Sequence, residues 1–200
     1  MYASIPALNL LKEFEDGVED YFAPGFELIA FGEDDGGYPQ LSDRIRPFAQ
    51  ATGSGSTYAI WLLDDRADLA TLPVLLLGDE GGVHVVARDL PELLRVLASG
   101  RSPMCDWDGV DYYDERDEED GDAGDGDAGD GDAGDGDAGD GYDPCPENPA
   151  FRAWLRDRFG LEAAEDPNAV VRAAGAELGD AFAAWIGPLV PDAVAARGTA

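Results

Sequence analysis

The chain has 200 residues, enough for one ordinary domain with extensions or for two small domains. Its formal net charge of −30 at pH 7 makes nucleic acid and anionic membranes unsuitable partners and a basic protein surface a suitable one. The sequence has no apolar run of membrane-spanning length, and it begins without the positive leader of a signal peptide. We therefore expect a cytoplasmic protein that binds neither nucleic acid nor membrane.

The first hundred residues have the patterns of an α+β domain. Leu8, Leu11, Phe14 and Val18 recur at helical spacing and predict an early helix within residues 1–22. Four later segments have strand composition and are bounded by turn-rich sequence: 26–32, 58–63, 74–77 and 83–87. The sequence GDEGG joins the last two segments and is typical of a β-hairpin.

A helix is predicted after the last of these strands. Asp89 can accept a hydrogen bond from the free amide of Glu92, and Gly100 follows the last apolar residue. The connections between the later strands are too short to contain crossover helices. We therefore expect an α+β fold with a mixed, mainly antiparallel sheet and with helices on one side of it.

The C-terminal region predicts two amphipathic helices. In the first, Asn148 is the expected N-cap and Gly160 the stop; in the second, Asp166 is the expected N-cap. The apolar stripe of each helix must be buried away from water, so we expect residues 147–192 to form a helical hairpin that packs on the α+β domain. Residues 193–200 are expected to be a disordered tail.

A strongly acidic run separates these two regions. Residues 106–143 contain 18 Asp or Glu residues and one basic residue, and residues 121–140 are four copies of GDAGD. A calcium loop needs oxygen ligands at fixed positions of a 12-residue segment, and no register of the repeat supplies them. Glycine and like charges dominate the repeat, so residues 105–146 are predicted to be a disordered acidic loop. Cys105 and Cys145 bracket it and are expected to be free thiols in the cytoplasm.

The sequence gives little indication of an enzyme. His84 is the only histidine and lies within a predicted strand, which favours a structural role over catalysis. We expect no catalytic residue, cofactor or metal site. Trp107, Tyr112 and Tyr113 are interspersed with acids; they are either anchors at a protein interface or residues that attach the start of the acidic loop to the domain.

Within residues 22–100 the chain resembles the SUKH superfamily, of the Smi/Knr and Syd type. The corresponding features are a Gly-rich turn, an inner strand, a Pro-Val strand, an acidic Gly turn and a helix: Gly53 and Gly55, Tyr58 to Leu62, Pro73 and Val74, Gly78 to Glu80, and Asp89 to Leu97. The resemblance implies that residues 1–104 form an α+β domain that binds proteins and has no catalytic residues.

Bacterial members of this superfamily include immunity proteins that neutralise toxins, often nucleases. The resemblance therefore implies a basic protein partner, such as a toxin, held through an acidic surface. Asp34, Asp35, Asp79 and Glu80 lie in predicted turns and are the candidate contact residues, together with the three aromatic residues above. The alternative is a cytoplasmic regulatory or scaffold protein whose acidic loop contacts a basic partner.

Overall fold

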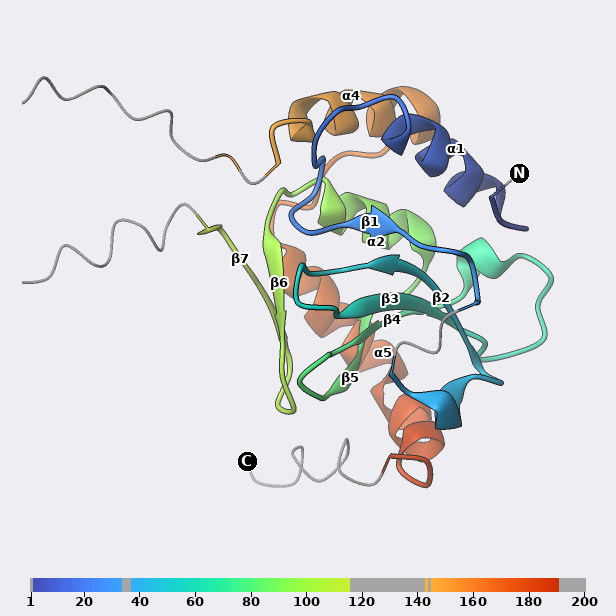
Figure 1. The fold of residues 1–200 in the computed structure, drawn as a ribbon. Coiled ribbons are helices and arrows are strands. Elements are labelled where there is room, and N and C mark those ends of the chain that lie inside the picture. The colour runs from blue at the N-terminus through green and yellow to red at the C-terminus, as the bar shows by residue number, and fades with distance from the viewer. Residues whose placement is uncertain (1, 34–36, 116–142, 144, 191–200) are drawn as a thin grey trace, which may run out of the picture.

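The fold combines one five-stranded sheet, a separate two-stranded sheet and flanking helices (Figure 1). The structure is a computed structural model that describes residues 2–33, 37–115, 143 and 145–190. The elements in chain order are α1 (Pro6–Glu15), β1 (Glu27–Leu28), the 3-10 helix η1 (Pro39–Leu41), β2 (Ile45–Gln50), β3 (Thr57–Trp61), the 3-10 helix η2 (Leu69–Thr71), β4 (Val74–Leu77), β5 (Val83–Ala87), α2 (Leu90–Leu97), β6 (Ser102–Cys105), β7 (Val110–Tyr113), α4 (Asn148–Phe159) and α5 (Pro167–Ile186). The predicted α+β class is confirmed.

The main sheet is an antiparallel meander in which β1 to β5 lie in sequence order. The predicted hairpin of β4 and β5 has the predicted bounds. Strand β2 was not predicted; it contains Pro47, and its register with β3 shifts between Pro47 and Ala49. Strand β1 is limited to Glu27–Leu28, shorter than the expected 26–32. Proline lacks a backbone donor and obscures a strand pattern, whereas the hairpin signal depends only on local sequence.

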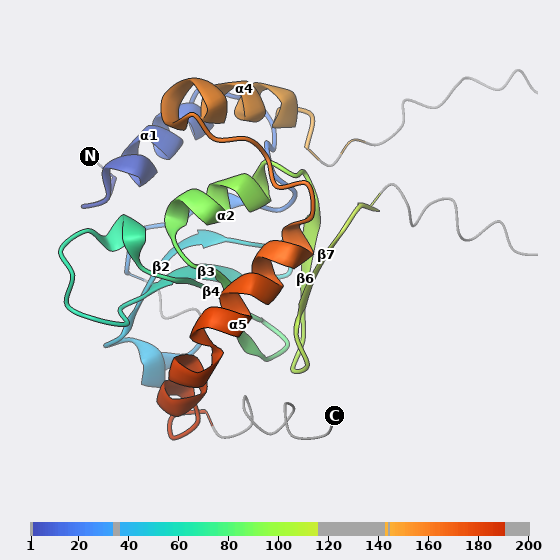
Figure 2. The ribbon, with the colours of Figure 1, turned by 180° about the vertical axis from the view of Figure 1, so that it is seen from behind.

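The central strands of the main sheet are buried on both faces. Ile60 of β3 and Leu76 of β4 belong to one hydrophobic cluster, whereas Trp61 and Leu75 belong to a second. Successive strand residues point to opposite faces, so the two clusters lie on opposite sides of the sheet. Helix α5 covers the second face, where Phe182 packs edge-on against Trp61 with the ring centroids 5.6 Å apart (Figure 2). The expectation of helices on one side only was therefore wrong.

The two C-terminal helices are both present, but they pack on different parts of the fold. In α4, Trp154 packs against Phe14 of α1, with the ring centroids 5.2 Å apart (Figure 1). The Asn148 side chain does not cap its own helix, because its amide donates to the Phe22 carbonyl at 2.8 Å and to the Leu97 carbonyl at 3.4 Å. Asn148 therefore links α4 to two distant segments, which corrects its predicted role.

The other predicted caps are present. Asp89 accepts from the Glu92 amide at 2.8 Å at the start of α2, and Asp166 accepts from the Ala169 amide at 3.1 Å at the start of α5. Gly160 adopts the left-handed conformation that ends α4. These three signals depend on neighbouring residues alone, so the sequence was sufficient to predict them.

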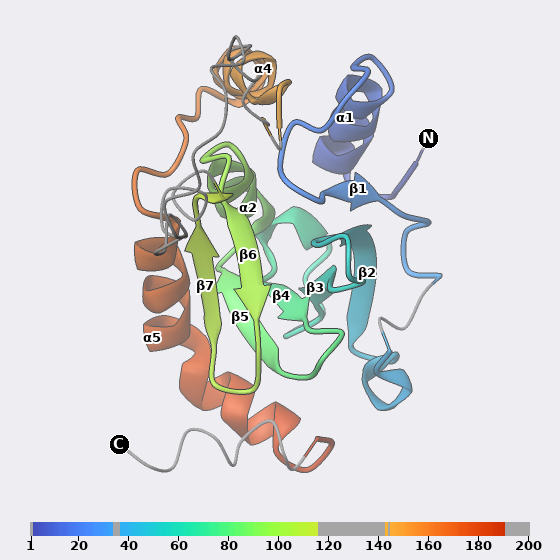
Figure 3. The same ribbon diagram turned by 60° about the vertical axis from the view of Figure 1, so that its left-hand side comes forward.

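Residues 102–113 form a hairpin, β6–β7, which lies beside the main sheet (Figure 3). The predicted boundary of the acidic loop at residue 105 is therefore wrong for residues 105–113. Tyr112 joins the hairpin to β3 through a buried hydroxyl pair with Tyr58 at 2.9 Å. Asn168 of α5 accepts from the Tyr112 amide at 2.7 Å and donates to its carbonyl at 3.0 Å. The predicted disorder of residues 116–142 and of the tail 193–200 lies outside the described residues.

The buried hydroxyl pair predicts a non-additive effect on stability. Tyr112→Phe leaves the Tyr58 hydroxyl buried without its partner, so the free energy of unfolding should fall by about 1–2 kcal/mol. Adding Tyr58→Phe removes the unsatisfied group and should restore most of that loss. Urea unfolding of wild type, both single variants and the double variant measures the coupling between the two hydroxyls. If the losses of the two single variants add up in the double variant, the predicted coupling is wrong.

Candidate functional site

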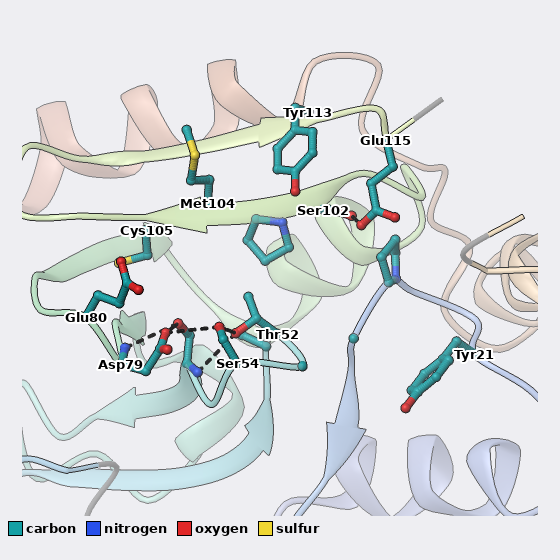
Figure 4. Close-up of a pocket in the computed structure, with 16 residues that line it drawn as sticks. Tyr21, Thr52, Ser54, Asp79, Glu80, Ser102, Met104, Cys105, Tyr113 and Glu115 are labelled. Atoms are coloured by element: carbon teal, nitrogen blue, oxygen red, sulfur yellow. Dashed lines mark hydrogen bonds between the residues drawn. The ribbon is translucent and has the colours of Figure 1, made fainter. Parts of the chain in front are cut away.

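A pocket of about 520 Å³ lies between the β6–β7 hairpin and two turns of the main domain. Its volume is within the roughly 300–1,000 Å³ typical of ligand pockets. Figure 4 shows Ser102, Met104 and Tyr113 on the hairpin side, Ser54 and Asp79 on the turn side, and further side chains at its ends. The pocket thus collects residues that are far apart in the sequence.

The turn side of the pocket is organised around the Asp79 carboxylate. It accepts hydrogen bonds from the Ser56 hydroxyl at 2.6 Å and from the Ser54 hydroxyl at 3.2 Å (Figure 4). Thr52 holds this arrangement, because its hydroxyl lies 2.9 Å from that of Ser54 and accepts from the Ser56 amide at 3.1 Å. The hydrogen bond from Ser56 holds the pKa of Asp79 below its usual range. Asp79 therefore carries a full negative charge at neutral pH.

The β6–β7 hairpin forms the opposite side of the pocket. It can approach the turn after β4 closely because that turn is rich in glycine. Gly81 has φ +116°, and a Cβ built there would lie 2.2 Å from the Trp107 ring. Gly82 has φ +84°, and its Cβ would lie 2.1 Å from the Asp106 carbonyl oxygen. Only glycine allows both this backbone conformation and this close approach. The tip of the hairpin therefore lies directly against the turn and fixes the width of the pocket.

Further hydrogen bonds support this contact: one joins β5 to the hairpin, and Tyr38 contacts two carbonyls of the turn itself. His84 of β5 lies with Nε2 2.7 Å from the Asp106 carbonyl oxygen, and this contact requires the Nε2 proton to donate. The Tyr38 hydroxyl lies 3.0 Å from the Gly78 carbonyl oxygen and 3.1 Å from that of Gly82. His84 is therefore part of the support of the pocket, in agreement with the structural role predicted for it.

The hairpin side of the pocket contributes both a thiol and a carboxylate. Burial raises the pKa of the Cys105 thiol to about 12, with smaller contributions from Asp106 and Asp79. At that pKa the nucleophilic thiolate is scarce at neutral pH, so Cys105 is unsuited to nucleophilic chemistry. The Ser102 hydroxyl donates to the Glu115 carboxylate and orients it. Cys105 and Cys145 do not form a disulfide with each other.

The electrostatics of the pocket are set by carboxylates. Some carboxylates elsewhere on the described surface have basic partners; Glu92 pairs with Arg88, for example, and Asp166 with Arg172. Around the pocket, Asp79, Glu80 and Glu115 pair with no lysine or arginine of the described chain, and none lines the pocket. The pocket therefore presents unpaired negative charge.

Exposed apolar side chains gather at the same place. Only four large hydrophobic residues among those described are exposed, and three of them lie in or beside the pocket. Tyr21 (47 % exposed) and Met104 (56 %) line it, and Trp107 (43 %) packs on the neighbouring Gly81. Exposed aromatic and methionine side chains of this kind are enriched at protein interfaces. The combination indicates a binding surface.

The structure brings some of the predicted site residues together and separates others. Asp79, Glu80 and Tyr113 line the pocket. Tyr112 is only 3 % exposed, so its prediction as a contact residue was wrong; it attaches the hairpin to the domain instead. Asp34 and Asp35 lie outside the described residues.

Sequence reasoning missed most of the residues that line the pocket, among them Tyr21, Met104 and Glu115. They come from the segment after α1, from β6 and from the residues after β7. The single available signal was that Tyr21 and Met104 interrupt polar or turn-like sequence with a large apolar side chain. Their common location depends on how the hairpin docks, which the local sequence does not encode.

The described residues contain no group of three or more His, Cys, Asp or Glu arranged to hold a metal ion. None of the described helices is both long and apolar enough to cross a membrane. Comparison of the chain with models of known protein families, with curated proteins and with solved structures gave no match. The resemblance to the SUKH superfamily therefore stays a prediction.

The contact at Gly81 predicts a large effect of a single methyl group. Gly81→Ala combines a strained φ with a clash against Trp107, so the free energy of unfolding should fall by about 2 kcal/mol or more. Gly175→Ala, in an open position within α5, is the matched control and should raise it by about 0.5–1 kcal/mol. Urea unfolding followed by circular dichroism measures both; equal effects of the two variants would contradict both the strained φ and the close contact at Gly81.

The hydrogen bonds to Asp79 predict how this group titrates. Its pKa is lowered in the folded state, so its contribution to stability is present above the unfolded-state value, about 3.9, and is lost as the pH falls through the folded value. Ser56→Ala should raise the pKa of Asp79 towards 3.9 by more than Ser54→Ala does. Carboxyl carbon NMR titration measures this, and an unchanged pKa in Ser56→Ala would refute the assignment.

Proposed function

We propose that this protein is a non-enzymatic binding domain, like the SUKH immunity proteins, that neutralises a basic protein such as a nuclease toxin. The observation that carries the proposal is the surface around the pocket, where Asp79, Glu80 and Glu115 have no described basic partner and lie among exposed apolar side chains. Apolar contacts give such a surface affinity, and the carboxylates select a partner of opposite charge.

The physical properties of a nuclease match this surface. A nuclease carries a basic cleft that binds the phosphates of its substrate, so an acidic protein associates with it rapidly and can cover the cleft. The net charge of −30 extends this attraction beyond the contact surface. An inhibitor of this kind acts by covering the cleft and needs no catalytic residue.

A regulatory or scaffold protein is the second candidate, and the position of Glu115 favours it. This residue lines the pocket and directly precedes residues 116–142, whose composition is dominated by Asp and Gly. In this case the acidic run itself supplies the contacts to a basic partner. Deletion of residues 117–141 separates the two candidates: binding is lost if the run makes the contacts and is retained if the folded surface makes them.

The primary test uses the product of any toxin gene encoded beside this gene. Co-expression should restore growth to cells producing that toxin, and the purified proteins should bind. Glu80→Lys should weaken binding about tenfold or more, whereas Asp65→Lys, which makes the same change of charge on an exposed residue outside the pocket, should have a smaller effect. Surface plasmon resonance measures both. Absence of binding and of growth rescue would overturn the proposed function.

A further inference from the structure

We propose that the pocket binds an arginine side chain presented by an extended segment of the partner protein. This inference rests on the proposed function, since it specifies which group of a basic partner the surface recognises. The pocket combines carboxylates, tyrosine rings and apolar side chains within one concavity, and these are the three kinds of group that a guanidinium and its aliphatic stem require.

The carboxylates supply the charge. Asp79 stays ionised because Ser56 donates to it, and Glu115 is held by the hydroxyl of Ser102. Asp79 and Glu115 belong to opposite sides of the pocket (Figure 4). A guanidinium has five donors in a planar fork, so it can form two parallel hydrogen bonds to one carboxylate, each strengthened by charge.

The aromatic and apolar groups favour arginine over lysine. Tyr113 lies on the hairpin side and Tyr21 at the end near α1, while the exposed Met104 side chain offers contact to the methylene groups of a stem (Figure 4). A guanidinium stacks on tyrosine rings and loses less hydration on burial than an ammonium does. A lysine would keep the charge attraction but lose the stacking.

The size of the pocket indicates that more than one side chain enters it. A volume of about 520 Å³ exceeds what a single arginine side chain fills, so the flanking backbone or neighbouring side chains of the partner would occupy the remainder. Glu80, which is exposed and lies in the turn beside Asp79, is placed to select a further basic residue. The inferred ligand is therefore an arginine within a basic segment rather than a free small molecule.

The test uses the full chain and three tripeptides with blocked ends, Gly-Arg-Gly, Gly-Lys-Gly and the neutral Gly-citrulline-Gly. In amide NMR titrations the arginine peptide should give saturable shifts at Ser54, Glu80 and Met104. The lysine peptide should bind at least about threefold more weakly, because it cannot stack. The citrulline peptide should give no saturable shift. Equal affinities for the three peptides, or shifts that map away from the pocket, would overturn the proposal.

Charge-neutralising variants test the assignment independently of peptide chemistry. The double variant Glu80→Gln/Glu115→Gln should lower the affinity for the arginine peptide about tenfold. The matched control Asp65→Asn/Asp157→Asn should keep an affinity within about twofold of wild type. Because loss of the Ser102 hydrogen bond in Glu115→Gln can disturb the hairpin, Glu80→Gln alone is a second variant and should weaken binding about threefold. Equal affinity in the double variant and its control would refute the pocket assignment.

The same variants separate this inference from the proposed function. If a neighbouring toxin binds wild type and Glu80→Gln/Glu115→Gln equally, the arginine pocket is refuted while the binding function stands. If the arginine peptide saturates the pocket but no basic protein is bound or neutralised, the chemistry of the pocket is supported and the immunity function is refuted.

Discussion

The binding surface depends on one close contact, that between the tip of the β6–β7 hairpin and the glycine turn after β4. Gly81 and Gly82 leave no side chain between the two backbones, so Trp107 and the Asp106 carbonyl lie directly on the turn. His84 completes the contact from β5 with a hydrogen bond to the same carbonyl. A hairpin of two short strands has little stability of its own. Its place beside the main sheet, and with it one side of the pocket, therefore depends on contacts that only the folded domain supplies.

The distribution of charge determines which kind of partner the pocket can bind. Most of the described ion pairs lie at the surface, where each contributes little to stability. In the pocket the acids have no described basic partner, they are gathered in one concavity, and Ser56 and Ser102 orient two of them. Unpaired like charges repel one another in the free protein, so a cation that enters the pocket relieves that repulsion as well as adding its own contacts. Such a surface is suited to a basic partner and unsuited to a phosphate or an acidic membrane.

Much of the main domain could be predicted because its signals are local. The β4–β5 hairpin follows from two apolar runs around GDEGG, and the start of α2 follows from the spacing of Asp89 and Glu92. The failures involve long-range partners. Asn148 has the sequence context of a cap, yet its amide reaches carbonyls in two other segments. The hairpin was assigned to the acidic loop because its own sequence is acidic, whereas the hydroxyl of Tyr58 and the side chain of Asn168 hold it in place.

The sequence by itself determined the α+β class, the acidic character and the presence of Asp79 and Glu80 in an exposed turn, because composition, periodicity and turn chemistry act over a few residues. Only the tertiary structure decided that this turn faces Glu115, Tyr113 and Met104 across a pocket. That juxtaposition results from close packing at glycine and from hydrogen bonds between residues more than fifty positions apart, such as Tyr58 with Tyr112. No local pattern encodes such contacts, because nothing in the sequence around either tyrosine indicates which distant residue it will contact in the folded chain.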